Sequence, residues 1–377
     1  MTPAYKGQNK VSNIDLSFSV SDFRNRILTW YDKHARILPW RATQTDTRNA
    51  YYTWLSEIML QQTTVQAVIP YFVSFIEKWP NIHDLARAKD EDVMKMWAGL
   101  GYYARARNLL KCARIISEYP YNGVFPKQID ELEKLPGIGP YTASAIASIA
   151  YDRPACVVDG NIERILSRIF AIQTPLPESK KQINDMASVL SEKRTDRPGD
   201  YAQALMDLGA TICTPKSPKC MICPVKELCI ACQNNIAHEL PRKKPKAIKP
   251  LRHGRVFWIE REDGAVLFET RKPERMLGGM AGLPGSKWDH KQNPDQPDIA
   301  DDIFSLVKDN ITASHKEHIG HTFTHFHLKL QIVETNTPDK NYEVRPPYFW
   351  VLKDDLDTLG LPSLFKKVVA FIKATKG

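Results

Sequence analysis

Long apolar runs are absent from the 377-residue sequence. No stretch reaches the roughly 18 consecutive apolar residues that a membrane-spanning helix needs. Residues 1–20 also lack the basic and then apolar order of a secretory signal. We therefore expect a protein of the cytoplasm with no membrane partner.

An extreme composition is also absent. Hydrophobic residues form 43% and charged residues 25% of the chain, which is ordinary for a globular protein and argues against a disordered or fibrous one. The length exceeds the usual domain size of about 100 to 200 residues, so two or three domains are expected. The formal net charge of +9 fits a negatively charged partner such as nucleic acid. Because many basic proteins bind no nucleic acid, charge alone does not decide the partner.

The period of the apolar residues divides the chain into segments. Over residues 21–232 apolar residues recur three and four positions apart, which predicts an almost wholly helical domain. Residues 233–250 have no period and are rich in proline and basic residues, so we expect a linker, either a solvated tether or a phosphate contact. Over residues 251–377 a hairpin at Asp263-Gly264, an alternating strand and a closing amphipathic helix predict an α+β domain.

Four of the seven cysteines fall close together, in the pattern C-x6-C-x2-C-x5-C. So local a group is unlike a disulfide framework, whereas four thiolates that close a short loop can hold an iron–sulfur cluster or zinc. Zinc ribbons usually have two close pairs, and this loop has one. The four are Cys213, Cys220, Cys223 and Cys229. Of the other cysteines, Cys112 and Cys156 are expected in the core, and Cys232 is given no role.

Residues 131–149 read as a helix, a Gly-x-Gly turn and a second helix. Gly137 and Gly139 would let the backbone approach a phosphate, and the N–H groups that open the second helix would point at the anion. The same letters form a plain turn between helices in most proteins. Here the turn lies between the basic, aromatic segment GLGYYARARN and the cysteine loop, which favours a DNA contact.

Two carboxylates stand in settings that suit acid–base chemistry. Asp159, in VVDGN, precedes a strongly periodic helix and is a good N-cap, whose backbone N–H donors also keep a carboxylate ionised. Glu57 lies among Leu55, Ile58 and Leu60, and taken singly it is more typical of a solvated helix face. If those apolar neighbours surround it, its neutral form is favoured and it can donate a proton near neutral pH.

Together these motifs resemble the adenine-DNA glycosylases of the MutY type, in the helix-hairpin-helix superfamily of endonuclease III. SEIMLQQT matches the segment around that family's catalytic glutamate, and the cysteine loop resembles its four-iron four-sulfur loop. The resemblance implies an all-α helix-hairpin-helix glycosylase domain with an iron–sulfur loop, followed by a smaller α+β Nudix-like domain. It also implies that Glu57 protonates a flipped adenine, that Asp159 stabilises the sugar, and that Tyr141 and Asn161 support both by hydrogen bonding.

The same resemblance separates two kinds of glycosylase. Endonuclease III-like enzymes carry a lysine after the hairpin whose amine attacks the sugar, and here that position is Tyr141. A phenol cannot form a Schiff base, so base removal without strand cleavage is favoured over a bifunctional pyrimidine glycosylase and lyase. A non-catalytic DNA-binding protein is the other alternative, which the presence of both Glu57 and Asp159 opposes. Gln62 and Tyr102 match residues that enter the double helix and hold bases apart.

The C-terminal segment resembles the Nudix-like domain of these glycosylases more loosely. No glutamate lies between Arg275 and Lys316, so a metal-dependent hydrolase is not expected and a binding role remains. Phe323, Thr324 and His325 align with the family's Phe-Ser-His loop, which reads 8-oxoguanine, whereas LGGMAGLP departs from the family's aromatic version. The resemblance thus implies binding of double-stranded DNA that contains adenine opposite 8-oxoguanine or guanine. Because binding a duplex needs only one copy, we expect a monomer, and without a signal or membrane span we expect it in the cytoplasm, associated with the nucleoid.

Overall fold

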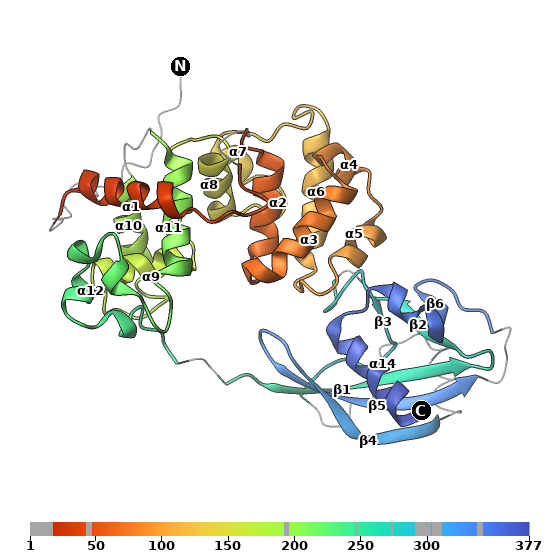
Figure 1. Cartoon of the computed structure of the whole chain (residues 1–377). Coiled ribbons are helices and arrows are strands. Elements are labelled where there is room, and N and C mark those ends of the chain that lie inside the picture. Colours follow the sequence, from red (N-terminus) through yellow and green to blue (C-terminus); the bar gives the residue numbers. More distant parts are fainter. Residues whose placement is uncertain are drawn as a thin grey trace. The chain divides into compact units, whose positions relative to one another are not determined.

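Helices follow one another from residue 20 to residue 233, which confirms the predicted helical segment. The structure is a computed structural model that describes residues 18–42, 47–191, 196–245, 248–272, 274–290, 303, 311–337 and 342–376. None of its described helices is long and apolar enough to cross a membrane. The helices of this segment are α1 (Val20–His34), α2 (Ala50–Leu60), α3 (Val65–Lys78), α4 (Ile82–Ala86), α5 (Asp90–Met96), α6 (Ala104–Ser117), α7 (Ile129–Leu132), α8 (Pro140–Ile149), α9 (Gly160–Ile169), α10 (Lys180–Ser191), α11 (Pro198–Thr211) and α12 (Ile230–Gln233) (Figure 1).

Two units make up the chain. One comprises Met1–Ala86 and Lys111–Pro245, and the other comprises Arg87–Leu110 and Lys246–Gly377. We refer to them as the helical unit and the sheet unit. The sequence pattern assigned residues 87–110 to the helical domain, whereas the structure groups them with the sheet unit.

Several helices of the helical unit begin where a side chain caps the backbone. Asn49 accepts hydrogen bonds from the backbone N–H groups of Tyr51 and Tyr52 at the start of α2. Asp159 accepts one from Ile162 at the start of α9. Such caps satisfy N–H groups that have no partner inside a helix, and each typically stabilises it by about 1 kcal/mol. The starts of α2 and α9 are thereby fixed, and both helices carry residues of the candidate site.

The segment after the cysteine loop packs into the helical unit. Ala237 and Leu240 are buried in the same apolar core as α1, α9 and α11. Leu240 also accepts a hydrogen bond of 2.9 Å from the fully buried Arg168, and Lys243 forms a bridge with Leu176. The linker predicted at residues 233–250 therefore begins later, beyond Lys243, because these apolar side chains bury surface that a tether would expose.

A mixed sheet forms the centre of the sheet unit (Figure 1). Its strand order is β3-β2-β1-β5-β4, with β6 paired to β2. β1 and β5 run parallel, and the other pairs are antiparallel. The predicted hairpin joins β1 to β2 through Gly264, whose φ of 83° suits glycine. The strands are β1 (Leu251–Arg261), β2 (Ala265–Thr270), β3 (Ala281–Gly282), β4 (Ile311–Thr322), β5 (His327–Thr337) and β6 (Tyr348–Leu352).

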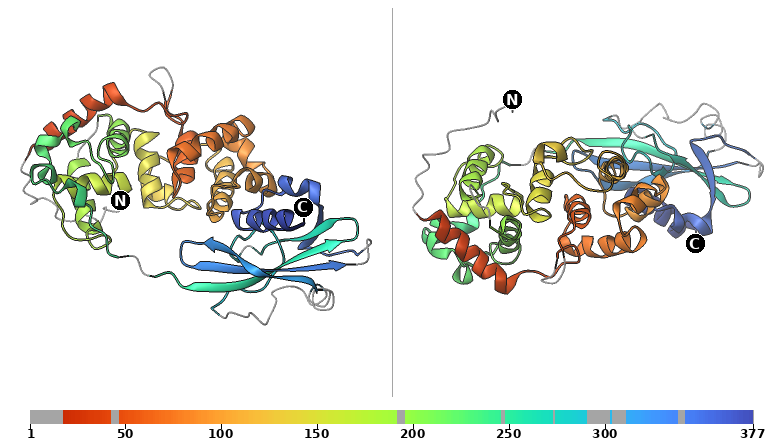
Figure 2. Two further views of the ribbon diagram at one scale, coloured as in Figure 1. Left: turned by 60° about the horizontal axis from the view of Figure 1, so that its bottom comes forward. Right: turned by 90° about the horizontal axis from the view of Figure 1, so that it is seen from above.

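The closing helix α14 (Ser363–Lys376) covers one face of this sheet (Figures 1 and 2). Leu328, Leu330 and Ile332 of β5 share a buried core with Leu364 and Val368 of α14. The alternation in the sequence predicted these three strand residues on one face, and the structure confirms it. Burying them against a helix supplies the main driving force for the unit, at roughly 25 cal/mol per Å² of apolar surface.

Candidate active site

One pocket of the helical unit gathers the predicted catalytic residues. It lies between the C-terminal end of α2, the loop after it, α8 and the start of α9. The four predicted catalytic residues all line this pocket, although more than 80 positions in the sequence separate Glu57 from Tyr141. The lining includes Arg36, Glu57, Gln61, Gln62, Tyr141, Asp159, Asn161 and Met206.

Glu57 is the most perturbed acid of this pocket. Its side chain is buried on α2, with 6% of the residue exposed. Burial raises its pKa to about 7, and the charge of Asp159 adds to the rise, while a hydrogen bond from Tyr141 and the charge of Arg41 oppose it. Near neutral pH both protonation states are therefore populated, which suits a group that donates a proton and later accepts one. The solvated helix face, which was the alternative for Glu57, is wrong.

Tyr141 contacts Glu57 from α8. Pro140 occupies the first turn of this helix and Tyr141 follows it, so the ring is placed by the hairpin itself. Burial and the nearby carboxylates raise the pKa of Tyr141 well above its ordinary value. The phenol therefore stays protonated and can donate to the carboxylate of Glu57, which favours the ionised form of that residue.

Asp159 caps α9 and faces the same pocket. One carboxylate oxygen accepts from the backbone N–H of Ile162 at 2.7 Å, and the other accepts from the side-chain amide of Asn161 at 2.7 Å. The N-terminal end of the helix dipole also favours a negative charge at this point. The cap role and the proposed catalytic role thus require the same ionised carboxylate.

A hydrogen-bonded chain leads from Asp159 to the cysteine loop. Asn161 accepts a hydrogen bond of 2.9 Å from the guanidinium of Arg164, which also donates to the carbonyl oxygen of Cys213 at 2.7 Å and to that of Gly209 at 2.7 Å. A Cβ at Gly209 would lie 2.5 Å from the Cβ of Asn161, so α11 can approach this closely only with glycine there. Arg164 and Gly209 were not predicted. The sequence signal that could have indicated Arg164 is its position three residues after Asn161, on the same face of α9.

A second cluster of charged side chains, centred on Asp207, lies near Glu57. Asp207 of α11 is fully buried and accepts from Arg36 at 2.6 Å and from both terminal nitrogens of Arg41 at 2.7 and 2.8 Å. Both arginines line a pocket that also contains Glu57. Two guanidinium groups against one buried carboxylate leave a net positive charge beside Glu57. Sequence reasoning missed this cluster, because Asp207 is more than 160 positions from both arginines.

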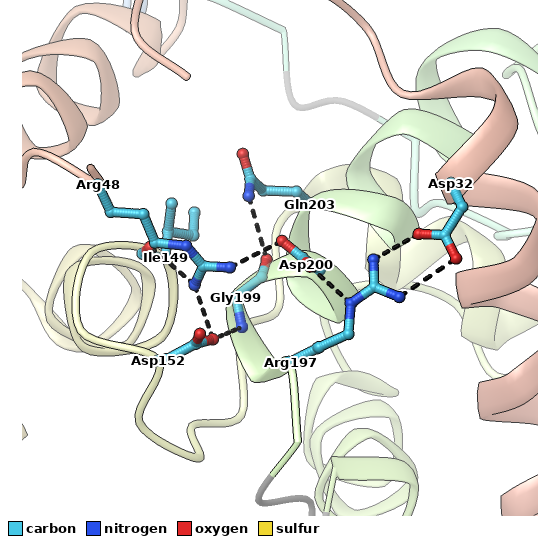
Figure 3. Close-up of polar contacts among 8 residues, drawn as sticks. All are labelled: Asp32, Arg48, Ile149, Asp152, Arg197, Gly199, Asp200 and Gln203. Atoms are coloured by element: carbon cyan, nitrogen blue, oxygen red, sulfur yellow. Dashed lines mark hydrogen bonds and ion pairs between the residues drawn. The ribbon is translucent and has the colours of Figure 1, made fainter. Parts of the chain in front are cut away.

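The start of α11 is tied to its neighbours by ion pairs (Figure 3). Arg48 bridges Asp152 at 2.7 Å and Asp200 at 2.8 Å. Arg197 connects Asp200 at 2.8 Å to Asp32 at 2.5 Å. These contacts join α1, the segment after α8 and α11, and so hold the helix that carries Asp207 and Gly209.

The predicted hairpin is present between α7 and α8. Gly137 has a φ of 79°, a conformation that favours glycine. Gly139 caps α8, and a Cβ built on it would meet no atom within 4 Å. Gly139 and Pro140 are exposed, so an anion can approach the start of α8, as a phosphate contact requires.

The two predicted wedge residues share an uncommon backbone conformation. Gln62 has a φ of 62° and Tyr102 a φ of 49°, in the left-handed region that few residues other than glycine adopt. Both are exposed, Gln62 in the helical unit and Tyr102 in the sheet unit. Both side chains are therefore accessible to a ligand, although six other non-glycine residues among those described also have a positive φ.

Within the sheet unit, the predicted reader loop contacts Tyr102. The hydroxyl of Tyr102 lies 2.8 Å from that of Thr324. Thr324 and His325 are exposed, whereas Phe323 is half-buried, with its ring 4.9 Å from that of Phe326 and 4.6 Å from that of His321. The ring of Phe323 therefore anchors the loop, and the two polar residues are the ones that a ligand can reach.

The four predicted cluster ligands line one pocket at the end of the helical unit. Four thiols around one pocket suit a four-iron cluster, which gives each sulfur its own iron. Arg168 donates a hydrogen bond of 3.2 Å to the sulfur of Cys213, which offsets thiolate charge.

Burial disfavours the thiolate form of two of these cysteines. Burial raises the pKa of Cys223 to about 12 and that of Cys229 to about 11. Iron would displace their protons, since a coordinated thiol is deprotonated. When bound, the cluster supplies iron–thiolate bonds that cross-link the loop from Cys213 to Cys229, and the donor set fits it.

Comparison with known families divides the chain as the periodicity of the sequence does. Residues 55–191 match the family described as HhH-GPD superfamily base excision DNA repair protein. Residues 213–229 match the iron–sulfur binding domain of endonuclease III, and residues 255–371 match the NUDIX domain.

Individual relatives extend over most of the chain. Adenine DNA glycosylase of Homo sapiens is 33% identical over 93% of this chain and 73% of its own length. Adenine DNA glycosylase of Buchnera aphidicola subsp. Baizongia pistaciae is 42% identical over 93% of this chain and 97% of its own. Among solved structures, that of a thermostable thymine-DNA glycosylase covers 57% of this chain and 97% of its own, with a TM-score of 0.50 and 29% identity. The chain therefore belongs to the adenine DNA glycosylase family, and it is a base-excision repair glycosylase with an iron–sulfur binding loop and a Nudix-like domain.

Proposed function

We propose that this chain hydrolyses the N-glycosidic bond of adenine that is mispaired with 8-oxoguanine, or with guanine, in double-stranded DNA. The observation that carries the proposal is the pocket shared by Glu57 and Asp159, one an acid whose pKa burial raises to about 7 and the other a carboxylate that accepts hydrogen bonds from two donors. N-glycosidic cleavage needs this division, an acid at the leaving group and an anion beside the positively charged sugar.

Glu57 is the general acid. Its carboxylic acid donates a proton to N7 of the flipped adenine while the bond from the sugar carbon to N9 breaks, and the bonding electron pair leaves with the base. The charge of Arg41 and the phenol of Tyr141 both favour the carboxylate that remains. This carboxylate then accepts a proton from the incoming water, which leaves free adenine and an abasic sugar.

Asp159 faces the sugar. Its carboxylate stabilises the positive charge that develops on the sugar carbon, or bonds to it transiently before water attacks. Asn161 fixes the orientation of this carboxylate and is itself fixed by Arg164. Prealigned charge of this kind needs no reorganisation during the reaction.

The reaction stops at base removal. Tyr141 stands where bifunctional relatives have an amine, and a phenol cannot form a Schiff base with the sugar. We infer that strand cleavage at the abasic site needs alkali or another enzyme.

DNA is held as a duplex by a single copy of the chain. The hairpin at Gly137 and Gly139 contacts a phosphate through backbone N–H groups, and Gln62 and Tyr102 hold the bases apart. Thr324 and His325 read the base opposite adenine, on a loop anchored by Phe323. The cytoplasmic, nucleoid-associated location stays a prediction.

Duplexes that contain adenine opposite 8-oxoguanine, adenine opposite guanine, or thymine glycol test the proposal. We expect free adenine from the first two and strand breaks only after alkali. Release of thymine glycol with breaks before alkali would identify the bifunctional alternative. Tight duplex binding without any base release would identify a non-catalytic DNA-binding protein.

A further inference from the structure

Strand β5 leads away from the reader loop (residues 323–325) with basic side chains along one face. Its other face is apolar, since Leu328 and Leu330 are buried in the core that they share with α14. His325, His327 and Lys329 alternate with these residues and so lie on the opposite side of the sheet. All three are exposed. The reader loop and this face of β5 are therefore one continuous surface of the sheet unit.

The neighbouring strands add basic residues to the same surface. β1, β5 and β4 lie side by side in that order (Figure 1). His253 of β1 is opposite Lys329, and Arg255 is opposite Gln331, to whose side-chain oxygen it donates a hydrogen bond of 3.3 Å. His318 of β4 is opposite Gln331 on the other side. Paired residues point to the same side of a sheet. We call the side chains of His253, Arg255, His318, His327 and Lys329 the basic face.

The composition around the basic face differs from that of a surface that is merely solvated, where charges of both signs mix. Residues 251–255, 318–322 and 327–331 contain three Lys or Arg, four His and no Asp or Glu. The segment that borders β1 contains Asp289, and Lys287 two positions before it offsets that charge. Solvation alone does not require the exclusion of acids, whereas an anionic partner favours it.

Further along the strands the same side of the sheet is apolar and packed. Phe257 lies two positions after Arg255 on β1, and Val333 lies two positions after Gln331 on β5. Both are buried in a core that includes Ile303. Packing therefore accounts for one part of this side of the sheet, and the basic face is the part that adjoins the reader loop.

We propose that the basic face binds the phosphate backbone of duplex DNA beside the base that the reader loop contacts, with Lys329 and Arg255 as the phosphate-binding residues. The proposal rests on the proposed function for the partner and for the role of His325. A strand rises about 3.3 Å per residue, so Lys329 lies about 13 Å along β5 from His325. One strand of B-DNA has a phosphate about every 3.4 Å along the axis, so the contact falls about four nucleotides from the base opposite adenine.

The salt dependence of duplex affinity tests the proposal. Lys329→Gln removes the charge and keeps a polar side chain on the strand. We expect its affinity for undamaged duplex and for duplex with adenine opposite 8-oxoguanine to fall by the same factor, roughly fivefold near 0.1 M salt, and the slope of log affinity against log salt to shrink by about one. Lys329→Arg keeps the charge and should restore both values. Lys373→Gln on α14, which covers the other face of the sheet, is the matched control and should equal wild type. Wild-type slopes in both Lys329→Gln and Arg255→Gln would overturn the proposal.

Duplexes with one shortened arm test where the contact lies. Shortening one of the two arms to two base pairs beyond the lesion should abolish the difference in affinity between wild type and Lys329→Gln, because the phosphates that Lys329 reaches are then missing. Shortening the other arm should leave the difference intact. A difference that survives both truncations would show that Lys329 does not bind the backbone beside the lesion.

These measurements separate the basic face from the proposed reaction, because affinity for undamaged duplex involves no base release. Adenine release together with equal salt slopes in wild type, Lys329→Gln and Arg255→Gln would remove the basic face and leave the reaction. A reduced slope in Lys329→Gln, in a chain whose wild type releases no adenine, would support the basic face and remove the reaction.

Discussion

Asn161 donates a hydrogen bond of 2.7 Å to Asp159 and thereby fixes the second oxygen of a carboxylate whose first oxygen caps α9. The amide is itself held, since its own oxygen accepts a hydrogen bond of 2.9 Å from Arg164. The carboxylate of Asp159 is thus restrained at both oxygens, and the hydrogen bonds continue through Arg164 to the carbonyl oxygen of Cys213 in the cysteine loop.

The first prediction concerns this restraint. Asn161→Ala should slow adenine release by roughly 10 to 100-fold, the size expected when one hydrogen bond to a charged group is lost, while duplex affinity stays near wild type. Single-turnover rates with adenine opposite 8-oxoguanine check it. Asn184→Ala, at an exposed asparagine of α10 outside the pocket, is the control and should leave the rate unchanged.

The second prediction concerns the acid. Glu57→Gln keeps the size of the side chain but cannot donate a proton, so adenine release should fall by roughly a hundredfold or more with binding retained. In wild type the rate should fall as pH rises through about 7, because the protonated form of Glu57 is then depleted. A near-normal rate in the variant would remove Glu57 from the role.

Tyr141 gives a third, independent test through the pH profile. Its hydrogen bond favours the carboxylate of Glu57, so Tyr141→Phe should raise the pKa of Glu57 further and move the decline in rate to higher pH. Tyr52→Phe on α2 changes a phenol that does not line the pocket and should leave the profile in place. A loss of rate without displacement of the profile would assign Tyr141 an orienting role only.

The same pKa predicts a stability effect. Folding raises the pKa of Glu57 from 4.5 to about 7, so between these values the folded chain holds a proton that the unfolded chain has released. Stability contributed by this group is therefore lost as pH rises from about 4.5 to about 7. Glu57→Gln should be more stable than wild type near pH 8 by up to about 3 kcal/mol, and no more stable near pH 4. Thermal or urea unfolding at both pH values measures the difference, and an equal difference at both would contradict it.

What a sequence pattern can reveal depends on the distance between partners along the chain. The segments around Glu57, Asp159, the hairpin and the four cysteines are each contiguous, and so each can be recognised from its residues alone. Asp207 could not be linked to Arg36 or Arg41, because 171 and 166 positions separate them and only the packing of α11 brings them together.

The local sequence pattern gave a wrong prediction where tertiary packing decides the structure. The proline and basic residues of 233–243 are typical of a tether, yet Ala237 and Leu240 are buried in the helical core. For Leu240 the deciding contact comes from a residue distant in sequence, the guanidinium of Arg168.

The next prediction contrasts two ion pairs. Asp207→Asn leaves two guanidinium groups of a buried cluster without their carboxylate, and it should cost about 3 to 5 kcal/mol of folding stability. Asp32→Asn removes an exposed partner of Arg197 and should cost about 1 kcal/mol or less. Urea unfolding of both variants near neutral pH measures the two costs. Equal costs would show that burial does not set the value of these contacts.

The last prediction concerns the base opposite adenine. 8-Oxoguanine differs from guanine by an oxygen at C8 and a hydrogen at N7, so discrimination needs a polar group near those atoms. Thr324 and His325 are the exposed polar residues of the loop, and Thr324 is held by the hydroxyl of Tyr102 at 2.8 Å. Loss of one such contact should reduce the preference for 8-oxoguanine over guanine by about 1 to 3 kcal/mol, roughly 5 to 150-fold.

His325→Ala and Thr324→Ala should therefore narrow the ratio of rates and affinities for the two duplexes, with adenine opposite guanine little changed. Point variants are preferable to removal of residues 251–377, because residues 87–110 pack in the same unit and would lose their partner. Lys373→Ala on α14, an exposed residue away from the loop, is the control. If His325→Ala and Thr324→Ala both keep the wild-type ratio while remaining folded, the lesion is read outside this loop and the assignment fails.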